Sequence, residues 1–148
     1  MQNLNMYCIT IHEGHLDLIK RLGYLPVGLG ENIKSKDFIR DNTNINISKK
    51  NPFYGEYTFH YWLWKNNMKN LEDKWIGFCQ YRKFWTTKKS EGDLKNFNYF
   101  SELLLKKIPN EYDDYDSILG EPLYVNQFKL SKFLKQNFRK MIKNPILF

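Results

Sequence analysis

The sequence predicts an α/β domain of three layers with a mostly parallel sheet. Two observations support this fold class. Short apolar runs rich in β-formers alternate with segments of helical periodicity, and the chain opens with a strand, a helix and a second strand. A length of 148 residues and a hydrophobic content of 42% are sufficient for one ordinary domain with a real core. We therefore expect a single domain over residues 1–148.

The first part of the predicted fold is a β-α-β unit followed by a loop. Residues 4–12 form an apolar run typical of a buried strand, and residues 15–22 have helical spacing that ends at Gly23. Residues 24–29 are predicted to form a second short strand. The polar stretch 28–46 is predicted to be a loop.

An aromatic helix is predicted to begin at Asn51 and to extend to Lys65. The Asn51 side chain can accept an unpaired backbone N–H at a helix start, and Pro52 at the first helical position removes no needed donor. The aromatic side chains that follow recur at helical spacing and form one face: Phe53, Tyr57, His60, Tyr61 and Trp64.

Two interpretations of this aromatic face stay open. The face can be core, with the polar tips of Tyr and Trp reaching hydrogen-bond partners. The polar residues around the helix favour instead a sugar or phosphate pocket, and they comprise Glu56, Thr58, Lys65, Asn66 and the run 41–44. An aromatic content of 17% is high, which favours a ring-lined surface or pocket.

The second part of the chain is predicted to add two strands and a helix. After a linker over residues 67–74, the apolar run 75–81 is typical of a third strand entering the sheet. A charged loop follows over 88–95, and a short helix is expected over 99–107. A fourth strand is expected over 115–125, interrupted by a glycine and a proline.

Cysteine usage and hydropathy place the protein in the cytoplasm. Cys8 and Cys79 both lie inside apolar runs without metal-ligand spacing, so we expect two buried thiols. No apolar run approaches the roughly 20 residues needed to span a bilayer. The first residues lack the charged and apolar regions of a secretory signal.

The net charge of +7 is concentrated at the C-terminal end. Six basic residues and no acidic residue follow Glu121, and the apolar residues among them recur at helical spacing. We expect a basic amphipathic helix over 126–148. Such a helix suits peripheral contact with an anionic membrane, or it packs on the domain with solvated lysines. Nucleic acid is disfavoured as a partner because the first 121 residues are nearly neutral.

The ends of the predicted strands supply candidate ligand contacts, because open α/β sheets bind ligands beyond the carboxyl ends of their strands. These candidates are Thr10, His12, Gly28, Tyr81, Arg82 and Lys83. The Arg82 guanidinium could grip a diphosphate bidentately, or it could form a surface ion pair. His12 could act as a base or nucleotide contact, or it could be structural. Neither a P-loop nor a dinucleotide fingerprint is present.

Five sequence blocks carry a family resemblance. They are Asp41-Asn42-Thr43, Asn46-Ile47-Ser48, the run 51–58 beginning Asn51-Pro52-Phe53-Tyr54, the run 61–66, and Ile76-Gly77-Phe78-Cys79-Gln80-Tyr81-Arg82-Lys83. In this order, and spread over residues 7–125, they resemble the signature blocks of a bacterial family of capsular and exopolysaccharide biosynthesis proteins. That family was long described as a domain of unknown function and is regarded as GT-A-like glycosyltransferases.

The resemblance implies a GT-A-like α/β domain that takes a sugar from a nucleotide-sugar donor. The acceptor would be a growing, lipid-linked capsular, exopolysaccharide or lipopolysaccharide glycan. The resemblance covers the N-terminal portion of the family domain, so we expect a truncated domain. The alternative is a catalytically inactive carbohydrate- or partner-binding module at the membrane surface. One departure is Gln80, where the family usually has a histidine, and glutamine can hydrogen-bond but cannot titrate.

A sugar transferase must stabilise the departing nucleoside diphosphate with a divalent ion such as Mn²⁺ or Mg²⁺ on an Asp-x-Asp, or with cationic side chains. Asp114-Tyr115-Asp116 matches that pattern but precedes a predicted strand, so we expect a solvated loop and assign no metal ligand. Arg82, Lys83 and Lys65 are therefore the expected diphosphate contacts. Thr10, His12 and Asp41 would lie near the nucleoside, and Glu56 would bind a sugar hydroxyl or act as a base. The remaining donor-binding candidates are Asn42, Asn46, Ser48, Asn51, Tyr54, Tyr61 and Tyr81.

Overall fold

The computed structural model describes residues 2–71 and 75–120. The chain divides into two compact units, Met1–Asp116 and Ser117–Phe148, and every described helix and strand belongs to the first. Of the second unit, residues 117–120 are described, and they are irregular. The predicted basic helix over 126–148 lies outside the described residues.

A small, mostly parallel sheet forms the centre of the first unit. The long strand β1 (Gln2–Thr10) lies between β2 (Leu25–Gly28) and β3 (Trp75–Gln80) and pairs with both in parallel. The short strand β4 (Lys107–Ile108) pairs antiparallel with the first residues of β1. The predicted α/β fold with a mostly parallel sheet is therefore confirmed.

The described residues also form four α-helices and four 3-10 turns. The helices are α1 (Leu16–Arg21), α2 (Asn51–Tyr54), α3 (Tyr57–Asn67) and α4 (Phe97–Leu103). The 3-10 turns are η1 (Glu13–His15), η2 (Ser48–Lys50), η3 (Met68–Leu71) and η4 (Asn110–Tyr112). Gly23, at φ +78°, follows α1 and lets the chain reverse into β2.

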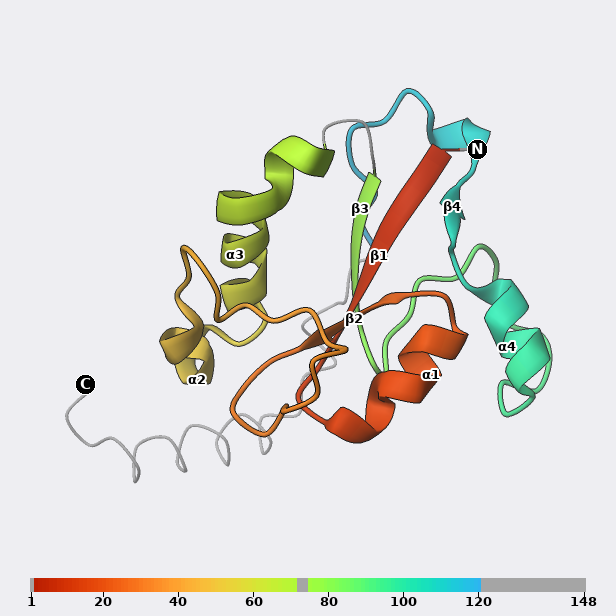
Figure 1. Ribbon diagram of the computed structural model, residues 1–148. Helices are drawn as coiled ribbons and strands as arrows, with labels where there is room; N and C mark the ends of the chain where they lie inside the picture. The colour runs from red at the N-terminus through yellow and green to blue at the C-terminus, as the bar shows by residue number, and fades with distance from the viewer. Residues whose placement is uncertain (1, 72–74, 121–148) are drawn as a thin grey trace, which may run out of the picture. The chain divides into compact units, whose positions relative to one another are not determined.

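Helices cover both faces of the sheet, with α3 on one side and α1 and α4 on the other (Figure 1). Alternating residues of β1 enter two separate cores, because successive side chains of a strand point to opposite faces. Met6 and Cys8 pack with Ile19 and Leu22 on the α1 side. The core on the α3 side contains Tyr7, Ile9, Val27, Leu29, Phe59, Trp62 and Leu63.

Both cysteines are buried, free thiols, as expected from their apolar surroundings. Cys8 of β1 lies directly opposite Cys79 of β3 in the parallel register. A hydrogen bond between the two thiols, together with burial, raises the pKa of Cys79. The Cys79 thiol is therefore a neutral part of the core.

The predicted single helix from Asn51 to Lys65 is wrong, because the chain breaks at Gly55. Gly55 has φ +55°, a conformation that glycine adopts without strain, and it separates α2 from α3. Asn51 does not cap α2. Its side-chain amide instead donates to the Gly55 carbonyl and to Thr58 Oγ1 across the break.

The interpretation of the aromatic face as core is also wrong. The buried residues of α3 are Thr58, Phe59, Trp62 and Leu63. Of the predicted face, Phe53, Tyr57 and Trp64 are exposed, and His60 and Tyr61 are half-buried. Apolar residues occupy both sides of α3, so helical spacing alone could not identify which side is buried.

The region after β3 differs from the prediction in two places. Helix α4 begins earlier than expected, where the Asn96 side chain accepts the backbone N–H groups of Asn98 and Tyr99, and it ends at Leu103. Residues 104–108 are extended instead of helical and include β4. No strand forms over residues 115–120, and the rest of the predicted fourth strand lies outside the described residues.

The Phe59→Ala substitution tests the packing of α3 against the sheet. The Phe59 ring is fully buried and contacts Tyr7, Trp62 and Phe78. Its removal leaves a cavity, so we expect the free energy of unfolding to fall by about 3–5 kcal/mol in urea denaturation. Phe53→Ala, at a side chain that is 74% exposed, is the control and should change it by less than about 0.5 kcal/mol. Equal losses would contradict the packing described here.

Candidate functional site

The carboxyl ends of β1 and β3 form the point at which the strand order reverses. The chain passes from β1 to β2 on one side and later returns to β3 on the other side of β1. Open α/β sheets bind ligands beyond the carboxyl ends of their strands, at the point where the strand order reverses. Thr10 ends β1 there, and Gln80 ends β3.

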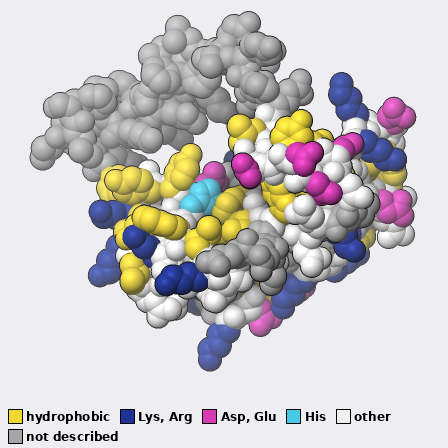
Figure 2. Space-filling model, turned by 90° about the horizontal axis from the view of Figure 1, so that it is seen from above, with side chains coloured by type: hydrophobic (Ala, Val, Ile, Leu, Met, Phe, Trp, Pro, Cys, Tyr) yellow, Lys and Arg dark blue, Asp and Glu magenta, His cyan; other side chains and the backbone are white. Residues whose placement is uncertain are grey.

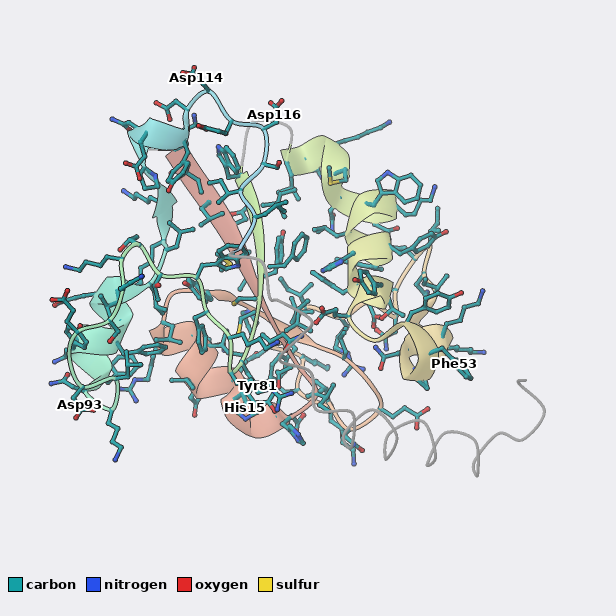
Figure 3. The ribbon with its side chains drawn as sticks, turned by 180° about the vertical axis from the view of Figure 1, so that it is seen from behind. His15, Phe53, Tyr81, Asp93, Asp114 and Asp116 are labelled. Atoms are coloured by element: carbon teal, nitrogen blue, oxygen red, sulfur yellow. The ribbon has the colours of Figure 1, made fainter. Side chains whose placement is uncertain are left out.

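A compact polar and aromatic cluster lies on the α1 side of this point. The buried Thr10 hydroxyl is 2.7 Å from His15 Nδ1 and accepts the His12 backbone N–H at 3.1 Å. The His15 ring stacks on the Tyr81 ring with 4.1 Å between centroids and 16° between planes. His12 meets Tyr81 edge-on at 6.3 Å. Figure 3 shows His15 and Tyr81 side by side at this end of the sheet.

The surroundings of His15 favour its neutral form. Burial and the neighbouring His12 both lower its pKa. The Thr10 hydroxyl lies within hydrogen-bond distance of both His15 Nδ1 and the His12 carbonyl, so the tautomer of His15 decides which of the two receives the hydroxyl proton. Sequence reasoning missed His15 by assigning it to a helix. Its place immediately after the end of β1 is the signal that could have identified it.

A tight turn after β3 presents Tyr81 and Arg82 at its corner. The backbone groups of Gln80 and Lys83 bond reciprocally, at 2.9 and 3.2 Å, and so close the turn. The Arg82 guanidinium lies 5.7 Å from the Tyr81 ring centroid, and both Arg82 and Lys83 are exposed. Tyr81 and Arg82 therefore lie next to the His15 cluster, with Arg82 free to reach an anion.

The α3 side of the same strand end carries a second polar group. Gln80 donates from Nε2 to Glu56 Oε2 at 2.5 Å, just before α3 begins. His60, one helical turn later, packs on Phe78 at 4.2 Å, and burial lowers its pKa despite the opposing effect of Glu56. Its Nε2 is buried with no hydrogen-bond partner among the described residues. Polar groups thus flank the end of β3 on both faces of the sheet.

Asp41 is a buried carboxylate near the carboxyl end of β2. Ile39 bridges in parallel to Val27, so the chain continues past the end of β2 toward Asp41. Asp41 Oδ2 has no partner among the described residues. Such an oxygen can accept a hydrogen bond from a ligand N–H or O–H.

Three of the predicted donor-binding residues, Asn46, Ser48 and Asn51, form hydrogen bonds within the fold itself. Asn46 donates to the carbonyls of Thr43 and Asn44 and accepts the backbone N–H and hydroxyl of Ser48. Asn51 links the two ends of the α2–α3 break, as described above. Asn42 is exposed. The loop before α2 is therefore fixed by its own amides.

The structure does not bring Lys65 to Arg82. Lys65 lies in the last turn of α3, nine residues after Glu56, which corresponds to about 13 Å along the helix axis. Its ammonium group lies 3.6 Å from the Trp64 ring centroid. Tyr61 packs edge-on against the same Trp64, and Tyr54 is exposed on α2. These three candidates belong to the outer side of α2 and α3.

The Asp-x-Asp of this sequence lies at the other end of the sheet. Figure 3 places Asp114 and Asp116 far from His15 and Tyr81, and Figure 2 shows acidic side chains gathered on the face seen from above. Among residues 2–71 and 75–120, no group of three His, Cys, Asp or Glu side chains could hold a metal ion.

The pKa of His15 should depend on the neighbouring His12 ring, which lowers it. We expect His15 and His60 both to titrate below the usual value of about 6.5. His12→Gln removes a nearby positive charge and should raise the pKa of His15 while that of His60 stays constant. An NMR pH titration of the imidazole Cε1–H signals measures both values. An unchanged His15 pKa would contradict the proximity of the two rings.

The same two histidines should make the free energy of unfolding depend on pH. Their lowered folded-state pKa values mean that the unfolded chain binds more protons just below pH 6.5. Stability should therefore fall as the pH drops below about 6.5 and level off, for these groups, below the folded-state values. Urea denaturation as a function of pH, with His15→Gln as the comparison, measures the contribution of His15.

No described helix has the length and apolar character needed to cross a membrane.

Comparison with known proteins identifies the family of this chain. No curated protein and no solved structure gives a significant match to the chain. The model of a domain of unknown function, DUF4422, matches residues 6–144, which includes the whole site described above. The chain therefore belongs to the DUF4422 family.

Proposed function

We propose that this protein is a GT-A-like glycosyltransferase. It would transfer a sugar from a nucleotide-sugar donor to a growing, lipid-linked capsular, exopolysaccharide or lipopolysaccharide glycan at the cytoplasmic face of the membrane. The observation that carries the proposal is the convergence of His15, Tyr81 and Arg82 at the reversal of strand order. The resemblance of the sequence blocks supports the same class of reaction.

The cluster has the chemistry that a nucleoside diphosphate needs. Arg82 supplies a planar fork that matches two phosphate oxygens, and Lys83 adds a second positive charge. The His15 imidazole offers a ring nitrogen for hydrogen bonding, and Tyr81 offers a ring edge and a hydroxyl. Because these groups are fixed before the reaction, they can stabilise the negative charge that develops on the leaving diphosphate.

Glu56 is the proposed base. In the transfer, the acceptor hydroxyl oxygen forms a bond to the anomeric carbon, and the bond from that carbon to the diphosphate oxygen breaks with its electron pair leaving on the diphosphate. The hydroxyl proton then goes to a carboxylate. Gln80 holds Glu56 through Oε2, at the same strand end as Arg82 but on the α3 side. A carboxylate at this strand end can act as the general base that receives this proton.

A second candidate function is a noncatalytic carbohydrate- or partner-binding module. The exposed rings of Phe53, Tyr57 and Trp64 favour it, because aromatic faces bind sugars and proteins. The two functions differ in their ligand, since the module has no need of a nucleotide.

Calorimetric titration with a panel of nucleotide sugars, with and without Mn²⁺ or Mg²⁺, tests the proposal. One nucleotide class should bind, and Arg82→Ala should weaken that binding about tenfold to a hundredfold through the loss of a charged hydrogen bond. Lys107→Ala removes one equal charge at the other end of β1 and should leave the affinity unchanged.

Two results would contradict the assignment. Equal donor binding by the wild type and Arg82→Ala would remove Arg82 from the diphosphate site. Absence of binding by any nucleotide sugar under every metal condition would reject the donor site and favour the noncatalytic module.

A further inference from the structure

Helix α3 is apolar on two opposite faces. Its inner face, which includes Phe59 and Trp62, is buried against the sheet. On the other side, Tyr57, Tyr61 and Trp64 recur at i, i+4 and i+7, and Met68 of η3 continues the line at i+11. At 100° per residue these four side chains share one stripe.

Most of this stripe is left exposed by the described part of the protein, and Tyr61 is half-buried. Tyr57 is 64% exposed and Trp64 is 57% exposed, and Met68 is also exposed. Helix α2 adds the exposed rings of Phe53 and Tyr54, and Figure 3 places Phe53 away from the sheet. We call Phe53, Tyr54, Tyr57, Tyr61, Trp64 and Met68 the outer aromatic surface. A helix that is apolar all round is normally buried, so this surface is expected to have a partner.

Within residues 48–71, which carry the outer aromatic surface, the charged side chains are nearly all positive. Lys49 and Lys50 precede α2, and Lys65 and Lys69 lie at the far end of α3. Glu56 is the only acidic residue in the stretch 48–71, and its carboxylate is bonded to Gln80 at the strand end. Lys65 packs its ammonium group on the Trp64 face at 3.6 Å.

We propose that the outer aromatic surface docks on a bilayer that contains anionic lipids. Tyr and Trp rings have an apolar body and a polar tip, which suits the boundary between headgroups and acyl chains. Lysines at both ends of the surface would contact lipid phosphates and strengthen binding to a charged membrane. The helix would lie in the plane of the interface, with its inner face still on the sheet.

This inference goes beyond the proposed function and does not depend on it. Vesicle binding requires no nucleotide sugar, and donor binding requires no vesicle. The two assays can therefore fail separately. The surface is also distinct from residues 126–148, so its contribution is measured in the full chain with that segment intact.

Co-sedimentation of the full chain with phosphatidylglycerol–phosphatidylcholine vesicles tests the proposal. The wild type should bind these vesicles and bind pure phosphatidylcholine more weakly. The double variant Tyr57→Gln/Trp64→Gln should lower the partition coefficient about tenfold, since two large apolar groups no longer enter the interface. Tyr115→Gln is the matched control, because Tyr115 is 60% exposed but lies among acidic residues, and its binding should be unchanged.

A fluorescence measurement keeps the test valid if the double variant folds poorly. In vesicles with brominated acyl chains, the tryptophan emission of the wild type should be quenched. Trp64→Phe should still bind and should lose most of that quenching. Three results would overturn the proposal: equal vesicle binding by the double variant and the wild type, quenching that persists in Trp64→Phe, or no vesicle binding together with a concentration-dependent dimer that the double variant abolishes.

Discussion

The parallel pairing of β1 with a neighbour on each side is the constraint on which the described unit depends. The register places Ile9 opposite Gln80 and Val27, so the carboxyl ends of the strands lie together. The alternation of β1 then gives each face its own core, one closed by α1 and one by α3. The loops that leave these strand ends have little freedom in where they start. For this reason Thr10, His15 and Tyr81 come together although they are far apart in the sequence.

The sequence was sufficient to predict the three parallel strands, because their apolar runs are bounded by glycine and polar segments. It was insufficient for α3, where Phe59 and Trp62 on one side and Tyr57 and Trp64 on the other have the same periodicity. The break at Gly55 depends on a positive φ that the neighbouring residues do not specify. Strand β4 has two residues and exists only because the start of β1 offers a free edge.

The candidate site was predictable in part. Strand-end reasoning identified Thr10, His12 and Tyr81, because the end of an apolar run is visible in a sequence. It did not select His15, because that residue was assigned to the following helix, and its contact with Tyr81 is visible only in the structure. The expected set of diphosphate contacts also grouped Lys65 with Arg82, although the length and direction of α3 separate these two residues. Two surfaces result, and we propose that one binds a nucleotide sugar and the other a membrane.

The most direct test of the central claim is an amide NMR titration of the ¹⁵N-labelled full chain with UDP and with GDP. The account predicts that one of these nucleotides shifts the amide signals of residues 10–15 and 80–83, which meet at the carboxyl ends of β1 and β3. Signals of β4 and η4, at the amino end of β1, should stay in place. Shifts confined to those segments, or no shifts with either nucleotide, would contradict a donor site at the reversal of strand order.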